Sequence, residues 1–488
     1  MLFGSISFVF VFLPLMLAGY HWCRVNGWQM CAKGLLIAGS LVFYGWWNVE
    51  YVPLVLLSVL GNYAVGRAMV RYRTAAWWIF LLGISLNLGL LIYFKYANFL
   101  LGNIAFAFHH DFAFARIAIP LAISFFTFQQ IAYLTEIHRG QPAAASLTDY
   151  ALFVLFFPHL IAGPITLHTE MLPQFARSGR GPLDSRWVMM GFAIFVLGLA
   201  KKVLFADTLG DVADPVFTAA AAGATPSLPE AWLGALGYTF QLYFDFSGYS
   251  DMAIGIGLLF GIRFPVNFTS PYKSTSIIEF WRRWHMTLSR FLRNYVYVPL
   301  GGNRRGRTRR YGNLLATMLL GGLWHGAGWT FVIWGTLHGV YLCLNHLAGA
   351  LGLGAARLGG RTGVLFGWAL TFVAVVVGWV FFRAPSVAAA LQILGGMVPG
   401  VGGGGAPDLG MQAFGWLTVA VAASVALLMP SILEITGYHA LLETGQIRAA
   451  RWEAVWTRPV FAAASLGVVA ALCATRLPDP GLFLYFTF

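Results

Sequence analysis

The hydrophobic pattern of this chain is a series of long apolar stretches separated by short polar segments. Most of the stretches approach the ~20 residues that a helix needs to cross the hydrocarbon core of a bilayer. The pattern predicts an all-α, polytopic transmembrane bundle of 11–12 spans. The candidate spans are 2–22, 34–49, 51–66, 75–94, 117–135, 187–206, 231–261, 328–349, 362–382, 412–432 and 459–475, with 313–326 as the twelfth.

Two segments depart from this pattern. The stretch 149–167 contains Pro158, Gly163 and Pro164 and is flanked by basic residues, which predicts a re-entrant segment with broken backbone. The region 384–411 includes a glycine run without the GK[ST] ending of a phosphate-binding loop, and we expect a Gly-rich outer loop. We find no tandem repeat, so 1–488 is predicted to form one membrane domain.

Composition agrees with burial in a lipid bilayer. The chain is 59% hydrophobic and only 10% charged, with a mean hydropathy of +0.72, whereas soluble domains carry about 25% charged residues. A globule of this size would still need a polar surface, and a bilayer removes that need. The bilayer is therefore the first predicted partner.

The positive charge is concentrated in one segment. Residues 263–313 hold eleven Lys or Arg residues and one acid, whereas 207–230 holds four acids and no base. In a membrane protein such a basic segment marks the cytoplasmic side and its anionic lipid, so we predict no nucleic-acid partner. The acidic segment is expected to form a loop on the opposite side.

The basic segment also carries a candidate chemical group. Its apolar residues recur at helical spacing while arginines fill the other faces, which predicts one amphipathic helix in the membrane interface. His285 lies inside this helix, where a surface helix alone does not explain it. The apolar positions are Ile277, Ile278, Trp281, Trp284, Leu288, Phe291 and Leu292.

The second candidate is His325, in the motif GGLWHGAGWTF. An ionisable residue at membrane depth is costly and usually functional, although a hydrogen bond between helices is the alternative. Glycines on both sides let the backbone approach a substrate or turn sharply. Trp324 directly precedes this histidine, and His338 follows thirteen residues later, close enough to join one cavity or to serve a structural role.

The third feature is Asp245 and Asp251 within the motif YTFQLYFDFSGYSDMAIGIG. Two carboxylates in a span predict a polar lumen, pairing with the arginines of the next segment, or a proton path. Motifs for other chemistry are absent from the sequence: there is no HxxxxD, GxSxG or HExxH motif and no zinc-type Cys/His spacing. We therefore expect no metal.

Several blocks together resemble the membrane-bound O-acyltransferase (MBOAT) family, and specifically its bacterial branch that acylates extracellular polymers, including alginate and teichoic acid. The blocks are FWRRWHMTLSRFLRNYVYVPLGG, GLWHGAGWTFVIWGTLHG, IPLAISFFTFQQIAYL, FFPHLIAGPI, YFDFSGYSDMAIGIG, GWVFFRA and the terminal LFLYFTF. The resemblance implies a ring of helices around a central funnel, with His325 as the principal histidine and His285 as the second.

The resemblance also implies an activity. His325 would act as general base while an acyl group, expected to be acetyl, passes from a cytoplasmic thioester such as acetyl-CoA to an extracellular polysaccharide. No permanently bound cofactor is expected. Asp245, His338, Trp324, Arg282 and Arg283 would line or support the substrate channel. The implied location is the bacterial inner membrane, and the implied partners are a periplasmic SGNH-type acyltransferase and polysaccharide synthesis and export proteins.

Three alternatives stay open at this point. A proton-coupled transporter or flippase would use the intramembrane aspartates and histidines as a path, and inverted repeats, which we do not find, would support it. A scaffold in a secretion complex would leave the GLWHGAG block without a purpose. An MBOAT enzyme with a lipid acceptor would share the same histidines. The segment TEIHRG at 135–140, which departs from the family pattern, leaves the substrate subgroup open.

Overall fold

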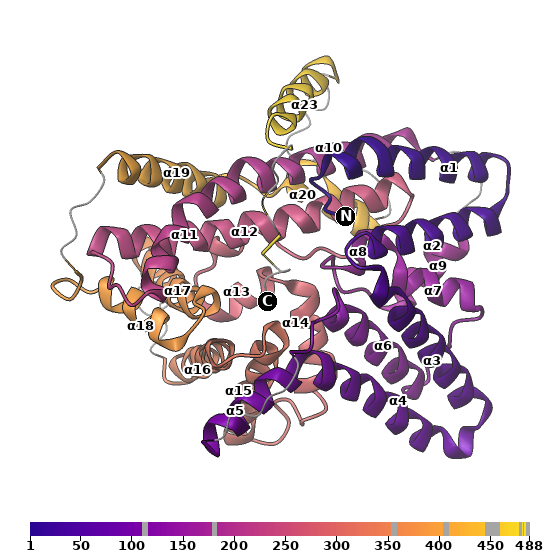
Figure 1. The fold of residues 1–488 in the computed structure, drawn as a ribbon, viewed down its shortest axis with the longest axis horizontal. Coiled ribbons are helices and arrows are strands. Elements are labelled where there is room, and N and C mark those ends of the chain that lie inside the picture. Colours follow the sequence, from indigo (N-terminus) through magenta and orange to yellow (C-terminus); the bar gives the residue numbers. More distant parts are fainter. Residues whose placement is uncertain are drawn as a thin grey trace. The chain divides into compact units, whose positions relative to one another are not determined.

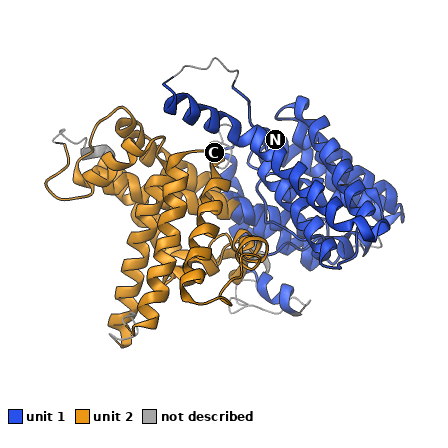
Figure 2. Cartoon of the chain, turned by 90° about the horizontal axis from the view of Figure 1, so that it is seen from below, with its two compact units in different colours: residues 1–199, 249–265, 436–479 blue, residues 200–248, 266–435, 480–488 orange. Residues whose placement is uncertain are grey.

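The computed structural model is helical throughout the residues that it describes. These are 1–109, 116–177, 183–352, 359–403, 409–444, 459–477, 481 and 483–484, and no strand occurs among them. The expected all-α class is therefore confirmed. The described helices divide into two compact units, coloured separately in Figure 2, and each unit is described by itself.

Unit 1 contains residues 1–199, 249–265 and 436–479. In it α1 packs on α2, and α3, α4 and α6 lie side by side (Figure 1). Its helices are η1 (Ser7–Phe12), α1 (Leu13–Val25), α2 (Gln29–Gly45), η2 (Val49–Tyr51), α3 (Val52–Arg71), η3 (Arg73–Ala75), α4 (Ala76–Leu91), η4 (Ile92–Tyr96), α5 (Ala97–Ala107), α6 (Ile123–His138), α7 (Leu147–Leu155), α8 (Phe157–Leu160), α9 (His168–Arg177), α10 (Ser185–Ala200), α21 (Tyr438–Thr444) and α23 (Pro459–Ala474).

The predicted broken backbone at 149–167 is present in unit 1. Helix α7 ends at Leu155, the single turn α8 follows, and residues 164–167 are not helical. The Ser40 hydroxyl accepts the backbone N–H of Phe157 at 3.0 Å, so a donor released at the break is satisfied by protein. Nearly the whole stretch is buried, which is the condition that irregular backbone needs in an apolar medium.

Unit 2 contains residues 200–248, 266–435 and 480–488, of which the described part carries the candidate histidines. Helix α12 (Leu228–Leu259) belongs to both units. The other helices of unit 2 are η5 (Lys201–Ala206), α11 (Asp207–Ala221), η6 (Pro271–Lys273), α13 (Ile277–Arg283), α14 (Met286–Leu292), η7 (Arg293–Tyr297), α15 (Arg307–His325), α16 (Trp329–Ala350), α17 (Gly360–Arg383), α18 (Val387–Gly396), α19 (Leu409–Leu428) and α20 (Ile432–Ile435).

Six described helical stretches are long and apolar enough to cross a membrane, and three shorter apolar helices accompany them. The chain is thus a multi-pass helical membrane protein, while the count of 11–12 spans stays a prediction. The six are Ser7–Val25, Val49–Arg71, Arg73–Ala107, Ser185–Ala221, Trp329–Ala350 and Gly360–Arg383, and the shorter three are Val387–Gly396, Gln412–Leu428 and Ala463–Ala474.

Two expected loops contain helices. The acidic segment was expected to be a loop from residue 207, but α10, η5 and α11 run on as one helical stretch to Ala221. Asp207, the first acid of this stretch, lies 2.7 Å from Lys202 five residues earlier, so its charge is compensated within the helix. In the expected Gly-rich loop, α18 occupies ten residues and begins at an N-cap, where the Ser386 hydroxyl accepts the N–H of Ala389.

Candidate active site

His325 is the last residue of α15, at a tight turn into α16. Gly326 and Gly328 cap the two helices in extended conformation, so only residues 326–328 separate them. His325 is buried, with 5% of its surface exposed. Aromatic rings surround it, with centroids 4.9 Å away at Trp324, 5.1 Å at Trp334 and 5.0 Å at Phe382.

The glycines of this motif, and Gly335 after it, leave space for neighbouring protein atoms. They do not form a turn of unusual dihedral angles. A Cβ on Gly322 would collide with the carbonyl oxygen of Phe331, and one on Gly326 would collide with the ring of the same phenylalanine. A Cβ on Gly335 would lie 2.5 Å from the carbonyl oxygen of Met318. These glycines therefore allow α15 and α16 to approach closely, which fixes His325 at the end of a rigid helix pair.

His285 occupies a break between two short helices, so the expectation of one continuous amphipathic helix was wrong. Helix α13 ends at Arg283, and His285 takes the left-handed conformation (φ 41°, ψ 54°) before α14 begins. A residue other than glycine is rarely found there. Residues of the preceding extended segment satisfy the groups freed at the break: Asn267 O accepts from Met286 N at 2.9 Å, and Thr269 N donates to Arg283 O at 3.0 Å.

The Asn267 side chain determines which ring nitrogen of His285 carries the proton. Its Oδ1 lies 3.0 Å from His285 Nδ1 and also accepts from the hydroxyl and the backbone N–H of Thr287. Because a backbone N–H can only donate, this atom is an acceptor, and Nδ1 must carry the proton. Burial lowers the pKa of His285 to about 3, so the imidazole is neutral at physiological pH and presents the lone pair of Nε2.

The two histidines lie together in the structure. Their ring centroids are 6.3 Å apart, and the Trp324 ring lies 4.9 Å from His325 and 6.0 Å from His285. On its other side His285 packs edge-to-face on Phe246 of α12 at 4.7 Å. Forty residues of sequence separate the two imidazoles, and tertiary packing brings them into one aromatic enclosure.

His338 lies one layer further out. Trp281 Nε1 donates to its Nδ1 at 3.3 Å, and its ring is 4.9 Å from Trp334, which in turn contacts His325. A Cβ on Gly378 would lie 2.9 Å from His338 Nε2, so that glycine accommodates the ring. His338 therefore supports the aromatic wall of His325 rather than facing it directly.

The two candidate arginines are held elsewhere. Arg283 pairs with Glu279 on the preceding turn of α13 at 2.7 Å, and Arg282 is exposed. Glu279 also accepts from the N–H and hydroxyl of Thr275. The structure thus places these arginines on the polar face of α13, beside the site rather than on the histidines.

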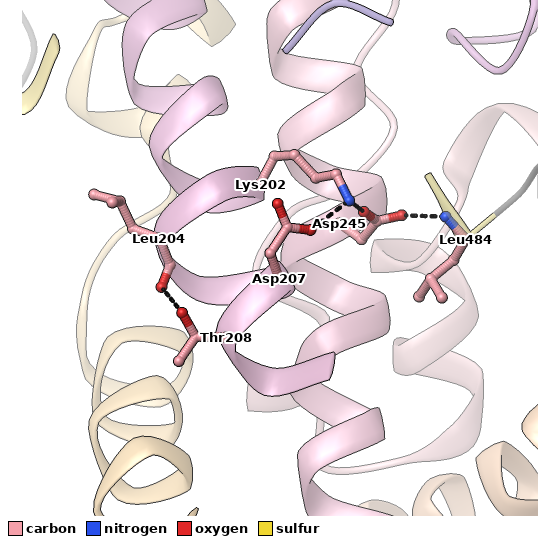
Figure 3. A network of polar contacts seen from close by, with 6 residues as sticks. All are labelled: Lys202, Leu204, Asp207, Thr208, Asp245 and Leu484. Atoms are coloured by element: carbon pink, nitrogen blue, oxygen red, sulfur yellow. Dashed lines mark hydrogen bonds and ion pairs between the residues drawn. The ribbon is translucent and has the colours of Figure 1, made fainter. Parts of the chain in front are cut away.

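Asp245 pairs with a lysine, so for this residue the alternative of pairing with the arginines of the next segment was wrong. Lys202 Nζ lies 2.7 Å from an oxygen of Asp245 and 2.7 Å from one of Asp207 (Figure 3). Lys202 was not among the residues predicted from the sequence. A signal was available in the pair of lysines at 201–202, which directly follow a long apolar run.

The arrangement can perform proton transfer in a dry environment. In its neutral form an imidazole can take a proton from a hydroxyl, and a second imidazole with a fixed tautomer lies beside that of His325. Aromatic walls exclude water and strengthen electrostatic effects at the reacting atoms. The fold defines a multi-pass helical membrane protein, and two buried histidines lie side by side within its helices.

Comparison with known proteins gives the family. Residues 10–382 match the model of the MBOAT, membrane-bound O-acyltransferase family. The chain therefore belongs to this family and is an O-acyltransferase of the membrane. This membership decides against the transporter and scaffold alternatives.

Individual relatives cover most of the chain. It is 43% identical over 427 residues to the peptidoglycan O-acetyltransferase of Helicobacter pylori, covering 82% of this chain and 80% of that protein. It is 46% identical over 406 residues to the probable alginate O-acetylase of Pseudomonas putida, covering 81% and 80%. It is 31% identical over 235 residues to the teichoic acid D-alanyltransferase of Streptococcus thermophilus, covering 46% and 56%.

Proposed function

We propose that this chain transfers an acetyl group from a cytoplasmic thioester, acetyl-CoA, across the bacterial inner membrane for O-acetylation of an extracellular polysaccharide. The observation that carries the proposal is the enclosure of two imidazoles, His325 and His285, 6.3 Å apart within aromatic walls. The names of the relatives, which include enzymes that act on peptidoglycan and on alginate, support the acetyl group and the class of acceptor.

His325 is proposed as the general base because 5% of this residue is exposed, whereas none of His285 is. It takes the proton of an acceptor hydroxyl while the hydroxyl oxygen attacks the thioester carbonyl. The C–S bond then breaks, and the thiolate receives the proton from the imidazolium. The products are an ester and a thiol, and His325 returns to the neutral form. Such base catalysis is worth about 10²–10⁴-fold.

His285 is proposed to orient the reacting groups. Its Nδ1–H is committed to Asn267, so Nε2 offers a fixed lone pair to a hydroxyl. We expect His285→Ala to reduce transfer strongly but less completely than loss of His325. An SGNH-type periplasmic partner would complete the transfer to the polymer, and polysaccharide synthesis and export proteins would supply the acceptor.

The test is His325→Gln, assayed as base-labile acetate on the cell-envelope polysaccharide of a host that carries no other such enzyme. We expect loss of acetylation with normal protein abundance. His346→Gln is the matched control, because this histidine lies on α16 and contacts Arg310 rather than the pair. Full acetylation by His325→Gln would refute the role of His325, and loss of acetylation by the control would refute the specificity of the assay.

A further inference from the structure

The buried carboxylate of Asp245 holds two partners at once. Lys202 Nζ lies 2.7 Å from Oδ1, and the backbone N–H of Leu484 donates to Oδ2 at 3.0 Å (Figure 3). The side chain of Asp245 is 1% exposed and that of Lys202 is 9% exposed. A buried carboxylate persists as an anion only when it is paired, so Lys202 maintains the charge that accepts from Leu484.

A π-helical turn places Lys202 for this task. It lies in η5, and Asp207, which it also contacts at 2.7 Å, follows five residues later. Residues five apart share a face in a π-helix, where hydrogen bonds link i to i+5. Such turns inside α-helices occur frequently at functional sites. The lysine therefore bridges a carboxylate on its own helix and Asp245 on α12.

A second point of contact involves Gly481. A Cβ on this glycine would lie 2.5 Å from Oδ1 of Asp207, so the backbone at this position rests directly against that carboxylate. Gly481, Phe483 and Leu484 are here called the tail segment. Both carboxylates that Lys202 holds thus face the tail segment, one at Gly481 and the other at Leu484. An ion pair that only joined two helices would need neither contact.

The third contact leads to the active site. The ring of Phe483 lies 6.2 Å from that of Phe246 at an interplanar angle of 60°. Phe246 is the residue after Asp245 on α12, and its ring packs edge-to-face on His285 at 4.7 Å. Phe246 and Phe483 are at most 2% exposed. The tail segment therefore packs behind the ring that supports His285.

We propose that Lys202, Asp207 and Asp245 form an anchor for the tail segment, and that the anchor positions Phe483 against Phe246 behind His285. Lys202 and Asp245 are thus positioning residues. Their effect on acyl transfer rests on the proposed function of the histidines, whereas docking of the tail segment does not.

Docking can be measured directly by the reactivity of a thiol introduced at position 484. In a chain whose four native cysteines are replaced, Leu484→Cys keeps the backbone N–H and places a thiol at a site that is 9% exposed. The rate of maleimide labelling of the purified full chain then reports release of the tail segment, since a buried thiol reacts only after local opening. Size-exclusion profiles identify the folded variants.

We expect Lys202→Met and Asp245→Asn to raise the labelling rate by at least about tenfold. Lys201→Met is the matched control, because it removes the same charge one residue away, where the ammonium lies over the Tyr243 ring at 5.7 Å. Its rate should stay within about twofold of the parent. Folded Lys202→Met and Asp245→Asn proteins that label no faster than Lys201→Met would overturn the proposal.

Two milder changes keep the test decisive if loss of a buried charge prevents folding. Gly481→Ala leaves every charge in place but would bring a Cβ within 2.5 Å of Asp207 Oδ1, so the tail segment and this carboxylate must move apart. It should also accelerate labelling of the introduced thiol. Leu484→Pro removes the donor to Asp245, and should lower acetyl transfer by at least about tenfold at normal abundance. An unchanged labelling rate in Gly481→Ala together with unchanged acetyl transfer in Leu484→Pro would refute the anchor. Labelling needs no activity, so failure of the function proposed for His325 would leave this result intact.

Discussion

The acceptor side chain of Asn267 offers a sharp test of how the second histidine is held. Asn267→Ala removes the oxygen that accepts from His285 Nδ1 at 3.0 Å and from the Thr287 hydroxyl at 3.0 Å. Both donors are buried. A buried donor left without an acceptor costs about 1–3 kcal/mol, and the imidazole is then free to rotate or to change tautomer.

The expected effect on catalysis follows from that energy. Each 1.4 kcal/mol corresponds to about a tenfold change in rate, so kcat for acetyl transfer should fall by about 5- to 140-fold if this energy is lost in the transition state. The KM for the acyl donor should change little, because Asn267 is fully buried and offers no surface to the donor. The assay is acetyl transfer by protein reconstituted in vesicles, with abundance and thermal midpoint measured beside it.

A charged variant separates orientation from protonation. Asn267→Asp keeps an acceptor at this position, but its negative charge raises the pKa of His285 from about 3. The acid limb of the pH–rate profile should therefore move to higher pH. Asn313→Ala is the control, since its amide donates to the carbonyl of Gly302 instead. Normal kcat in Asn267→Ala, or an unmoved acid limb in Asn267→Asp, would refute the reasoning.

Three further outcomes are expected. Gly322→Ala should lower the thermal midpoint by the equivalent of about 1–3 kcal/mol, because its Cβ meets the backbone of α16, whereas Gly312→Ala on the same helix has open space and should be neutral or stabilising. Burial lowers the pKa of His285 to about 3 from an ordinary 6.5, so on acidification the unfolded chain binds a proton before the folded chain does. The free energy of unfolding should therefore fall as the pH drops from about 6.5 toward 3. His285→Gln should reduce this pH dependence in thermal unfolding. A cysteine at the exposed position Ala219 should label with an impermeant maleimide in intact cells, whereas one at the exposed position Thr308 should label only after lysis. Labelling of both in intact cells would contradict the cytoplasmic position of the basic segment.

Local pattern was sufficient for the class of protein, and it singled out the two histidines that the structure brings together. Apolar runs of membrane-spanning length and 10% charged residues leave little alternative to a helical membrane protein. His325 and His285 could be singled out because an imidazole is costly in apolar surroundings unless it is used. These inferences depend on residues close together in the chain, so the sequence alone carried them.

Tertiary structure decided how those residues are held. The apolar spacing around His285 is that of a continuous helix, and the helix breaks because residues 267–269 supply hydrogen-bond partners to the freed backbone. Asp245 is paired with Lys202, forty-three positions earlier, rather than with a nearby arginine. Helical periodicity indicates which face of a segment is apolar, but it does not indicate which distant group will satisfy a buried donor or charge. That choice depends on which helices pack together, and here it determined the tautomer of His285 and the partner of Asp245.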